Sequence, residues 1–171
     1  FELAGEQAGA AAALRLAETY PAVYDTFRCV FEEAPDGGGD PVWRCDVFVY
    51  SPAGEKELDG RVVLLHQQLD ALSTATAVRT LRDRPGEPAI ERWQGEEGAH
   101  RERLEGLHFA GVDVHAAPTD ALACLDALAP VLEAARTLPF RSLRRALYIA
   151  PTNVNVGLHM AFDRGDRHDP A

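Results

Sequence analysis

Residues 111–130, GVDVHAAPTDALACLDALAP, contain the change from strand to helix that decides the fold class of this chain. Residues 108–115 form a short, largely apolar run that carries Asp113 and His115, which predicts a strand. Beyond Pro118 the leucines recur at helical spacing, which predicts a helix over 119–138. Pro130 should break this helix, because proline removes a backbone hydrogen bond. The stretch therefore predicts the first strand and the crossover helix of a βαβ unit.

Two further strands are predicted after this helix. The segment LRRALYIA, residues 143–150, completes the βαβ unit, whose two strands run parallel. The segment VNVGLHMAF, residues 154–162, alternates cleanly and is expected to form a hairpin with 143–150. The polar tail over 164–171 is predicted to be disordered.

The first half of the chain has weaker patterns. Its predicted elements are helices over 2–18 and 21–34, strands over 42–51 and 56–65 that form a hairpin, a helix over 67–82 and an irregular segment over 82–103. No internal repeat is visible. The predicted fold class is α/β, with α+β as the alternative. We expect a single domain over 1–163, in which N-terminal helices pack on a mixed β-sheet with a βαβ unit and a C-terminal hairpin.

Composition restricts the partners and the compartment. The net charge of −10 argues against a nucleic acid polymer as partner, because an acidic surface repels phosphates. No apolar run is long enough to cross a membrane. The cysteines are odd in number and form no CxxC pair, which predicts buried free thiols in the cytoplasm. We expect no cofactor and no metal site.

Three side chains are candidates for catalysis. Asp113 and His115 are two residues apart in a predicted strand, so they share a face, and His159 lies on the non-apolar side of the last strand. A histidine beside a carboxylate is the arrangement of a general base or of two metal ligands. No HExxH or GxSxG motif accompanies them. An exposed polar sheet face is the simpler interpretation of these residues.

The corner between strand and helix is a candidate ligand site. Ligands of open α/β sheets bind beyond the carboxyl end of a strand, and helix N-termini favour anions. The small residues Ala116 and Ala117 would let a ligand approach the backbone at the corner formed by Ala117, Pro118 and Thr119. Arg144 and Arg145 are the expected neutralising groups for a phosphate, although strand periodicity points them to opposite faces.

The stretch VDVHAAPTDALACLDALAP, with RRALY after it, resembles the late part of the SAVED domain, the CARF-like sensor of bacterial antiphage effectors. The resemblance covers residues 112–148 only. It rests on an apolar strand, a corner of two small residues and a proline, an alanine-rich helix and a later strand with Tyr148. It implies a cyclic-oligonucleotide ligand near Ala117–Thr119 and no catalysis in this domain.

Three functions are compatible with these features. The leading hypothesis is a non-catalytic regulatory or sensor domain that binds a small anionic ligand of the nucleotide type or a partner protein. The first alternative is an acidic protein-interaction module, similar in role to an immunity or adaptor protein. The second is a metal-dependent or acid/base enzyme that uses Asp113, His115 and His159.

Overall fold

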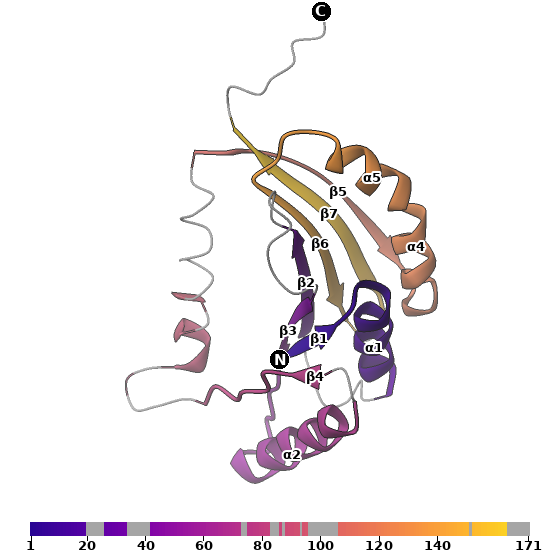
Figure 1. Ribbon diagram of the computed structural model, residues 1–171. Helices are drawn as coiled ribbons and strands as arrows, with labels where there is room; N and C mark the ends of the chain where they lie inside the picture. Colours follow the sequence, from indigo (N-terminus) through magenta and orange to yellow (C-terminus); the bar gives the residue numbers. More distant parts are fainter. Residues whose placement is uncertain are drawn as a thin grey trace, which may run out of the picture.

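A seven-stranded β-sheet organises the chain (Figure 1). The computed structural model describes residues 1–19, 26–33, 42–72, 75–82, 86, 88–92, 94–95, 106–150 and 152–163. Its elements are β1 (Glu2–Ala4), α1 (Glu6–Thr19), β2 (Thr26–Glu33), β3 (Val42–Phe48), α2 (Glu55–Ala71), β4 (Ala75–Thr76), β5 (His108–Ala116), the 3-10 turn η1 (Pro118–Asp120), α4 (Ala121–Ala127), α5 (Ala129–Arg136), β6 (Ser142–Ile149) and β7 (Val154–Phe162). The strand order is β4-β1-β3-β2-β6-β7-β5, and each described pairing is antiparallel.

The second half has the predicted architecture. Strands β5 and β6 both pair with β7 in the antiparallel sense, so they run parallel to each other with β7 between them. The hairpin of β6 and β7 is confirmed, as is the α/β fold class. The helix breaks as predicted, since α4 ends at Ala127 and α5 begins at Ala129 with Pro130 in its first turn.

The same order of elements occurs twice. In the first half β1 is followed by α1, β2 and β3, and β3 lies between β1 and β2 in the sheet. In the second half β5 is followed by α4, α5, β6 and β7, and β7 lies between β5 and β6. The halves meet where β2 pairs antiparallel with β6. The chain therefore contains a structural repeat that its sequence does not reveal.

The prediction of a helix over 21–34 is wrong for the residues that the structure describes there. Thr26–Glu33 form β2, which pairs with β3 on one side and β6 on the other. Phe27, Cys29 and Phe31 are buried on one face, and Val30 is buried on the other. An apolar run of this kind arises in a central strand and resembles the wide stripe of a buried helix. Residues 20–25 lie outside the described part.

The prediction of a strand over 56–65 that forms a hairpin with 42–51 is also wrong, and the predicted helix over 67–82 is helical only as far as Ala71. Residues Glu55–Ala71 form the single helix α2, which begins after Gly54, a residue with φ of +101°. Leu69 is buried in the main core, and Leu65 packs against it one helical turn away. The leucines and valines of this segment therefore follow a helical period. The described residues beyond 72 contain β4 and no continuation of the helix.

Smaller differences concern the ends of the elements. The predicted N-terminal helix over 2–18 begins only at Glu6, after the short strand β1 and Gly5, whose φ is +78°. The strand predicted over 42–51 ends at Phe48. The predicted tail over 164–171 and most of the segment over 82–103 lie outside the described residues.

Helices α1, α4 and α5 lie on the same side of the sheet (Figure 1). The main core forms between this side and the helices, from apolar residues of α1, α4 and the strands of both halves. A smaller cluster of Leu132, Leu143 and Leu158 lies under α5. None of the described helices combines the length and the apolar character that a membrane crossing requires.

Candidate functional site

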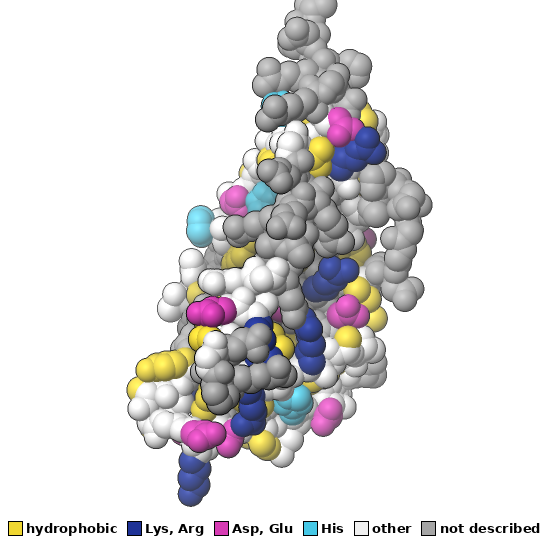
Figure 2. Space-filling view, turned by 90° about the vertical axis from the view of Figure 1, so that its left-hand side faces the viewer, with side chains coloured by type: hydrophobic (Ala, Val, Ile, Leu, Met, Phe, Trp, Pro, Cys, Tyr) yellow, Lys and Arg dark blue, Asp and Glu magenta, His cyan; other side chains and the backbone are white. Residues whose placement is uncertain are grey.

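The side of the sheet opposite these helices carries most of the polar strand residues. Antiparallel register places directly paired residues on the same face. We call this side the polar face. Three rows of paired residues cross its strands. The first row is Asp46, Arg28, Tyr148, Asn155 and His115; the second is Arg44, Val30, Ala146, Gly157 and Asp113; the third is Glu32, Arg144, His159 and Gly111. Figure 2 views the molecule from this side, and histidine and acidic side chains lie close together on it.

Asp113 and His159 form a contact between β5 and β7. The imidazole Nε2 of His159 lies 3.1 Å from Oδ2 and 3.2 Å from Oδ1 of Asp113. Both side chains are partly exposed. A histidine whose one nitrogen is held by a carboxylate keeps its other nitrogen for a ligand or a proton, which is the orienting role that carboxylates have in acid/base pairs.

Two glycines make room for this pair. A Cβ at Gly157 would lie 2.7 Å from Oδ1 of Asp113 and 2.9 Å from Cε1 of His159. A Cβ at Gly111 would lie 2.5 Å from Cδ2 of His159. The His159 imidazole therefore occupies the space that the side chain of any other residue at position 111 or 157 would need. The sequence alone does not indicate this role, and the only signal for it is a glycine within each strand pattern.

His115 does not join the contact between Asp113 and His159. It is exposed on β5, where it pairs in register with Asn155 of β7. No group of three or more metal-ligating side chains occurs among the described residues. The structure therefore brings together two of the three predicted catalytic candidates.

Arg144 lies beside the Asp113–His159 pair. It is opposite His159 in the register of β6 and β7. Its Nε is buried, and no hydrogen-bond acceptor among the described residues reaches it. The same holds for the Nε of Arg28, but a terminal nitrogen of Arg28 is paired with Asp46 on the same face. Arg144 therefore lies on the polar face next to His159, and its guanidinium has hydrogen-bond donors that the described residues do not use.

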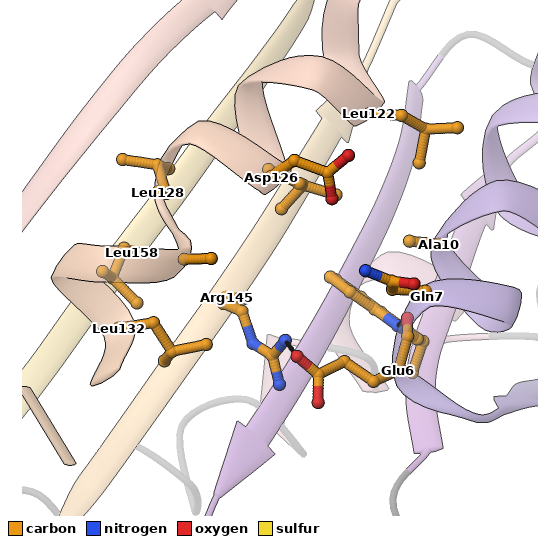
Figure 3. A pocket seen from close by; sticks show the side chains of 12 residues that line it. Glu6, Gln7, Ala10, Leu122, Asp126, Leu128, Leu132, Arg145 and Leu158 are labelled. Carbon is orange, nitrogen blue, oxygen red and sulfur yellow. Dashed lines mark hydrogen bonds and ion pairs between the residues drawn. The ribbon is translucent and has the colours of Figure 1, made fainter.

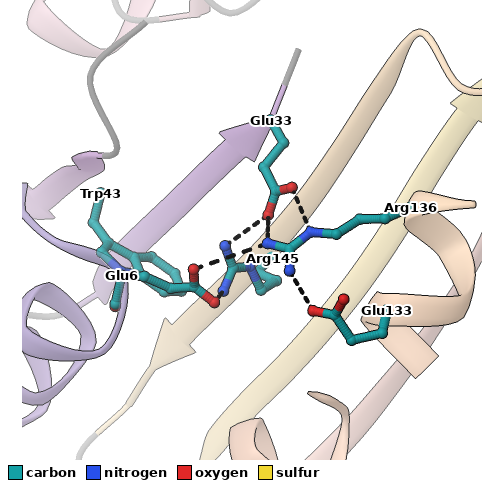
Figure 4. Close-up of polar contacts among 6 residues, drawn as sticks. All are labelled: Glu6, Glu33, Trp43, Glu133, Arg136 and Arg145. Atoms are coloured by element: carbon teal, nitrogen blue, oxygen red, sulfur yellow. Dashed lines mark hydrogen bonds and ion pairs between the residues drawn. The ribbon is translucent and has the colours of Figure 1, made fainter. Parts of the chain in front are cut away.

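Arg145 points to the opposite side of the sheet, as strand periodicity predicts. Its guanidinium binds Glu6 and lies 2.9 Å from Oε1 of Glu33 (Figure 4). It also lies 4.2 Å from the centre of the Phe31 ring, over the ring face. Arg136 also binds Glu33, through two hydrogen bonds of 2.8 and 2.6 Å. These hydrogen bonds raise the pKa of Arg136 above its usual value. The network neutralises Arg145 within the protein.

Arg145 also lines a small cavity between α1 and the helices α4 and α5 (Figure 3). The cavity has a volume of about 60 Å³, enough for a few water molecules and far below the size of a ligand pocket. Its other lining residues include Trp43, Leu125 and Leu132. Because Glu6 and Glu33 already bind the guanidinium, this cavity offers no free positive charge to an anion.

The predicted corner of Ala117, Pro118 and Thr119 lies elsewhere, at the end of β5. It forms the 3-10 turn η1, in which the amide of Asp120 donates to the carbonyl of Ala117 at 2.9 Å. Pro118 and Thr119 line a shallow hollow of about 250 Å³ against α1, together with Arg15. The Asp120 amide is thus occupied. The structure does not bring this corner together with Arg144.

Comparisons with known proteins find no relative. No protein-family model, no curated protein and no solved structure gave a match to this chain. The candidate site therefore stands on its own geometry.

Proposed function

We propose that this chain is a non-catalytic regulatory or sensor domain that binds a small anionic ligand on its polar face. Arg144 and His159 are the groups that contact the anionic part of the ligand. The observation that carries the proposal is that Arg144 lies opposite His159 in the register of β6 and β7 and forms no ion pair with the described residues. The terminal nitrogens of its guanidinium could therefore bind a phosphate or carboxylate, and arginine binds both in a fork geometry.

The surroundings of Arg144 suit a ligand of nucleotide size. Ala146 and Gly157, which have little or no side chain, separate two polar rows; both residues are buried, and the His159 imidazole lies over Gly157. Tyr148 lies on the far side of these two residues, four residues along β6 from Arg144, which corresponds to about 13 Å. Tyr148 is 39% exposed and presents an aromatic ring for stacking. Asn155, in the same row, has a buried Oδ1 with no partner among the described residues.

The test of this proposal is Arg144→Ala, measured by titration calorimetry and by thermal stabilisation. The ligands are inorganic phosphate, pyrophosphate, mononucleotides and cyclic oligonucleotides. We expect at least one to bind, and Arg144→Ala to weaken it by about 10- to 100-fold, since a hydrogen bond to a charged group contributes about 1.5–3 kcal/mol. Arg144→Lys should retain part of the affinity.

Arg141→Ala is the matched control, because Arg141 is an exposed arginine just before β6 that pairs with Asp163. It should leave binding unchanged. The proposal is rejected if no ligand of the panel binds, or if Arg144→Ala binds as tightly as the unmodified protein.

A second candidate function is favoured by the Asp113–His159 contact. Here His159, oriented by Asp113, acts as a general base on a bound substrate, as hydrolytic sites with a histidine and a carboxylate do. This candidate shares the polar face with the binding proposal. The two functions can be distinguished because only the catalytic one converts a substrate into product.

Turnover is tested with chromogenic esters and phosphate esters. If His159 is a general base, His159→Gln should lower the rate by about 100-fold or more. Gly157→Ala should also lower it, because the new Cβ would push Asp113 and His159 apart. Unchanged rates in His159→Gln, or no turnover by the unmodified protein, would exclude catalysis at this pair.

A further inference from the structure

Cys29 and Cys45 face each other across β2 and β3. They are direct partners in the antiparallel register, and their Sγ atoms are 3.2 Å apart. Both thiols are free and buried. Cys124, the third cysteine, is free as well and lies on α4. The pairing brings together two residues that are 16 positions apart in the sequence.

The backbone shows which kind of pair this is. The N–H of Cys45 donates to the carbonyl of Phe1 at 2.8 Å, and the N-terminal amine of Phe1 donates to the carbonyl of Cys45 at 3.1 Å. Both backbone groups of Cys45 therefore point toward β1 and away from β2. Cys29 and Cys45 form a non-hydrogen-bonded pair, in which Cα atoms lie about 4.5 Å apart and side chains approach most closely. This separation is within the range of disulfides.

We propose that Cys29 and Cys45 are a dithiol modification site, oxidised to a cross-strand disulfide by a small-molecule disulfide such as oxidised glutathione. One cysteine thiolate attacks a glutathione sulfur and releases one glutathione thiolate. The second cysteine then attacks the mixed disulfide, forms the Cys29–Cys45 bond and releases the second glutathione. The two cysteine sulfurs are oxidised, and the glutathione disulfide is reduced to two thiolates. These thiolates take up the two protons of the cysteine thiols and become two molecules of reduced glutathione.

The environment of the pair predicts when the reaction is fast. Burial raises the pKa of the Cys29 thiol well above its usual value, and the hydrogen bond with Cys45 adds to this effect. Little thiolate is therefore present at neutral pH, and a buried thiol reacts only when the structure opens. Oxidation should be slow in the folded protein and rapid during refolding in a glutathione redox buffer.

The bond can be located by peptide mapping of the full chain without reduction. Trypsin cleaves after Arg28, Arg44 and Lys56, so Cys29 and Cys45 lie on the peptides 29–44 and 45–56. Cys124 lies on a third peptide, 104–136. After refolding in the redox buffer we expect the first two peptides to be linked and Cys124 to remain alkylatable. Linkage that involves Cys124, or three free thiols after refolding, would overturn the proposal.

Thermal unfolding provides a second measurement that needs no variant of the pair. In a Cys124→Ser background, the oxidised form should unfold about 5 °C or more above the reduced form, because the bond closes a loop in the unfolded chain. Dithiothreitol should reverse the increase. Cys29→Ser in the same background is the control and should show no linked peptides. An oxidised form that unfolds at or below the temperature of the reduced form would show that the strands do not accommodate the bond.

Discussion

Replacing Arg145 by alanine is expected to lower the free energy of unfolding by about 3–5 kcal/mol, because it removes the buried cation of its charge network together with the packing of the Arg145 side chain on Phe31. The Arg145 side chain is only 9% exposed. Its loss would leave Glu6 without its close partner and Glu33 with Arg136 alone, and it would remove the cation from above the Phe31 ring. Urea unfolding followed by circular dichroism measures the change.

Arg144→Ala is the matched control for this prediction. It removes the same side chain one residue earlier on β6, from the polar face and without breaking an ion pair among the described residues. We expect it to change the free energy of unfolding by less than about 1 kcal/mol. Equal losses in the two variants would show that Arg145 is not specifically stabilised by its network. A double-mutant cycle with Glu33→Gln would then measure the coupling directly.

Replacing Trp43 by alanine is expected to be about as costly, at about 3–5 kcal/mol. Trp43 is 1% exposed and is the largest fully buried side chain among the described residues. Its Nε1 donates to the carbonyl of Glu6 at 2.6 Å, and its ring packs against Phe31 with centroids 5.4 Å apart. The side chain thus joins the start of α1 to the centre of the sheet. Alanine would leave a cavity and remove the indole hydrogen bond to the start of α1.

Two further variants separate these contributions. Trp43→Phe keeps much of the apolar volume and loses the hydrogen bond, so it should be destabilised by less than Trp43→Ala. Val63→Ala removes a 54% exposed valine on α2 and should have almost no effect. The prediction fails if Trp43→Ala unfolds within about 1 kcal/mol of the unmodified protein.

The candidate site was only partly accessible from the sequence. Strand periodicity correctly placed Asp113 and His159 on polar faces and separated Arg144 from Arg145. It could not show that Asp113 and His159 meet, because this depends on how β5 pairs with β7. The sequence also suggested that the corner at Ala117 and the two arginines form one site. In the structure the corner lies at the end of β5, Arg144 lies on the polar face of β6, and Arg145 binds Glu33 on the opposite face.

The fold, too, was only partly predictable from the sequence. The sequence by itself determined the second half, because the clean alternation of β7 and the proline break between α4 and α5 are local signals that need no distant partner. It did not determine β2, because the position of this segment as a strand depends on its pairing with β3 and β6, whose residues are distant in the sequence. It did not reveal the repeat, since the two halves share an order of pairing rather than residues.

Local periodicity depends on neighbours a few residues apart, and it is written directly in the sequence. Register, strand order and the contacts of the Asp113–His159 pair depend on residues tens of positions apart, and only the free energy of packing the whole sheet selects them. The sequence therefore determined which segments of the second half are strands and helices and which of their residues are polar. Only the tertiary structure decided that Arg144, His159 and Asp113 meet on one face, and that Arg145 is held in the core.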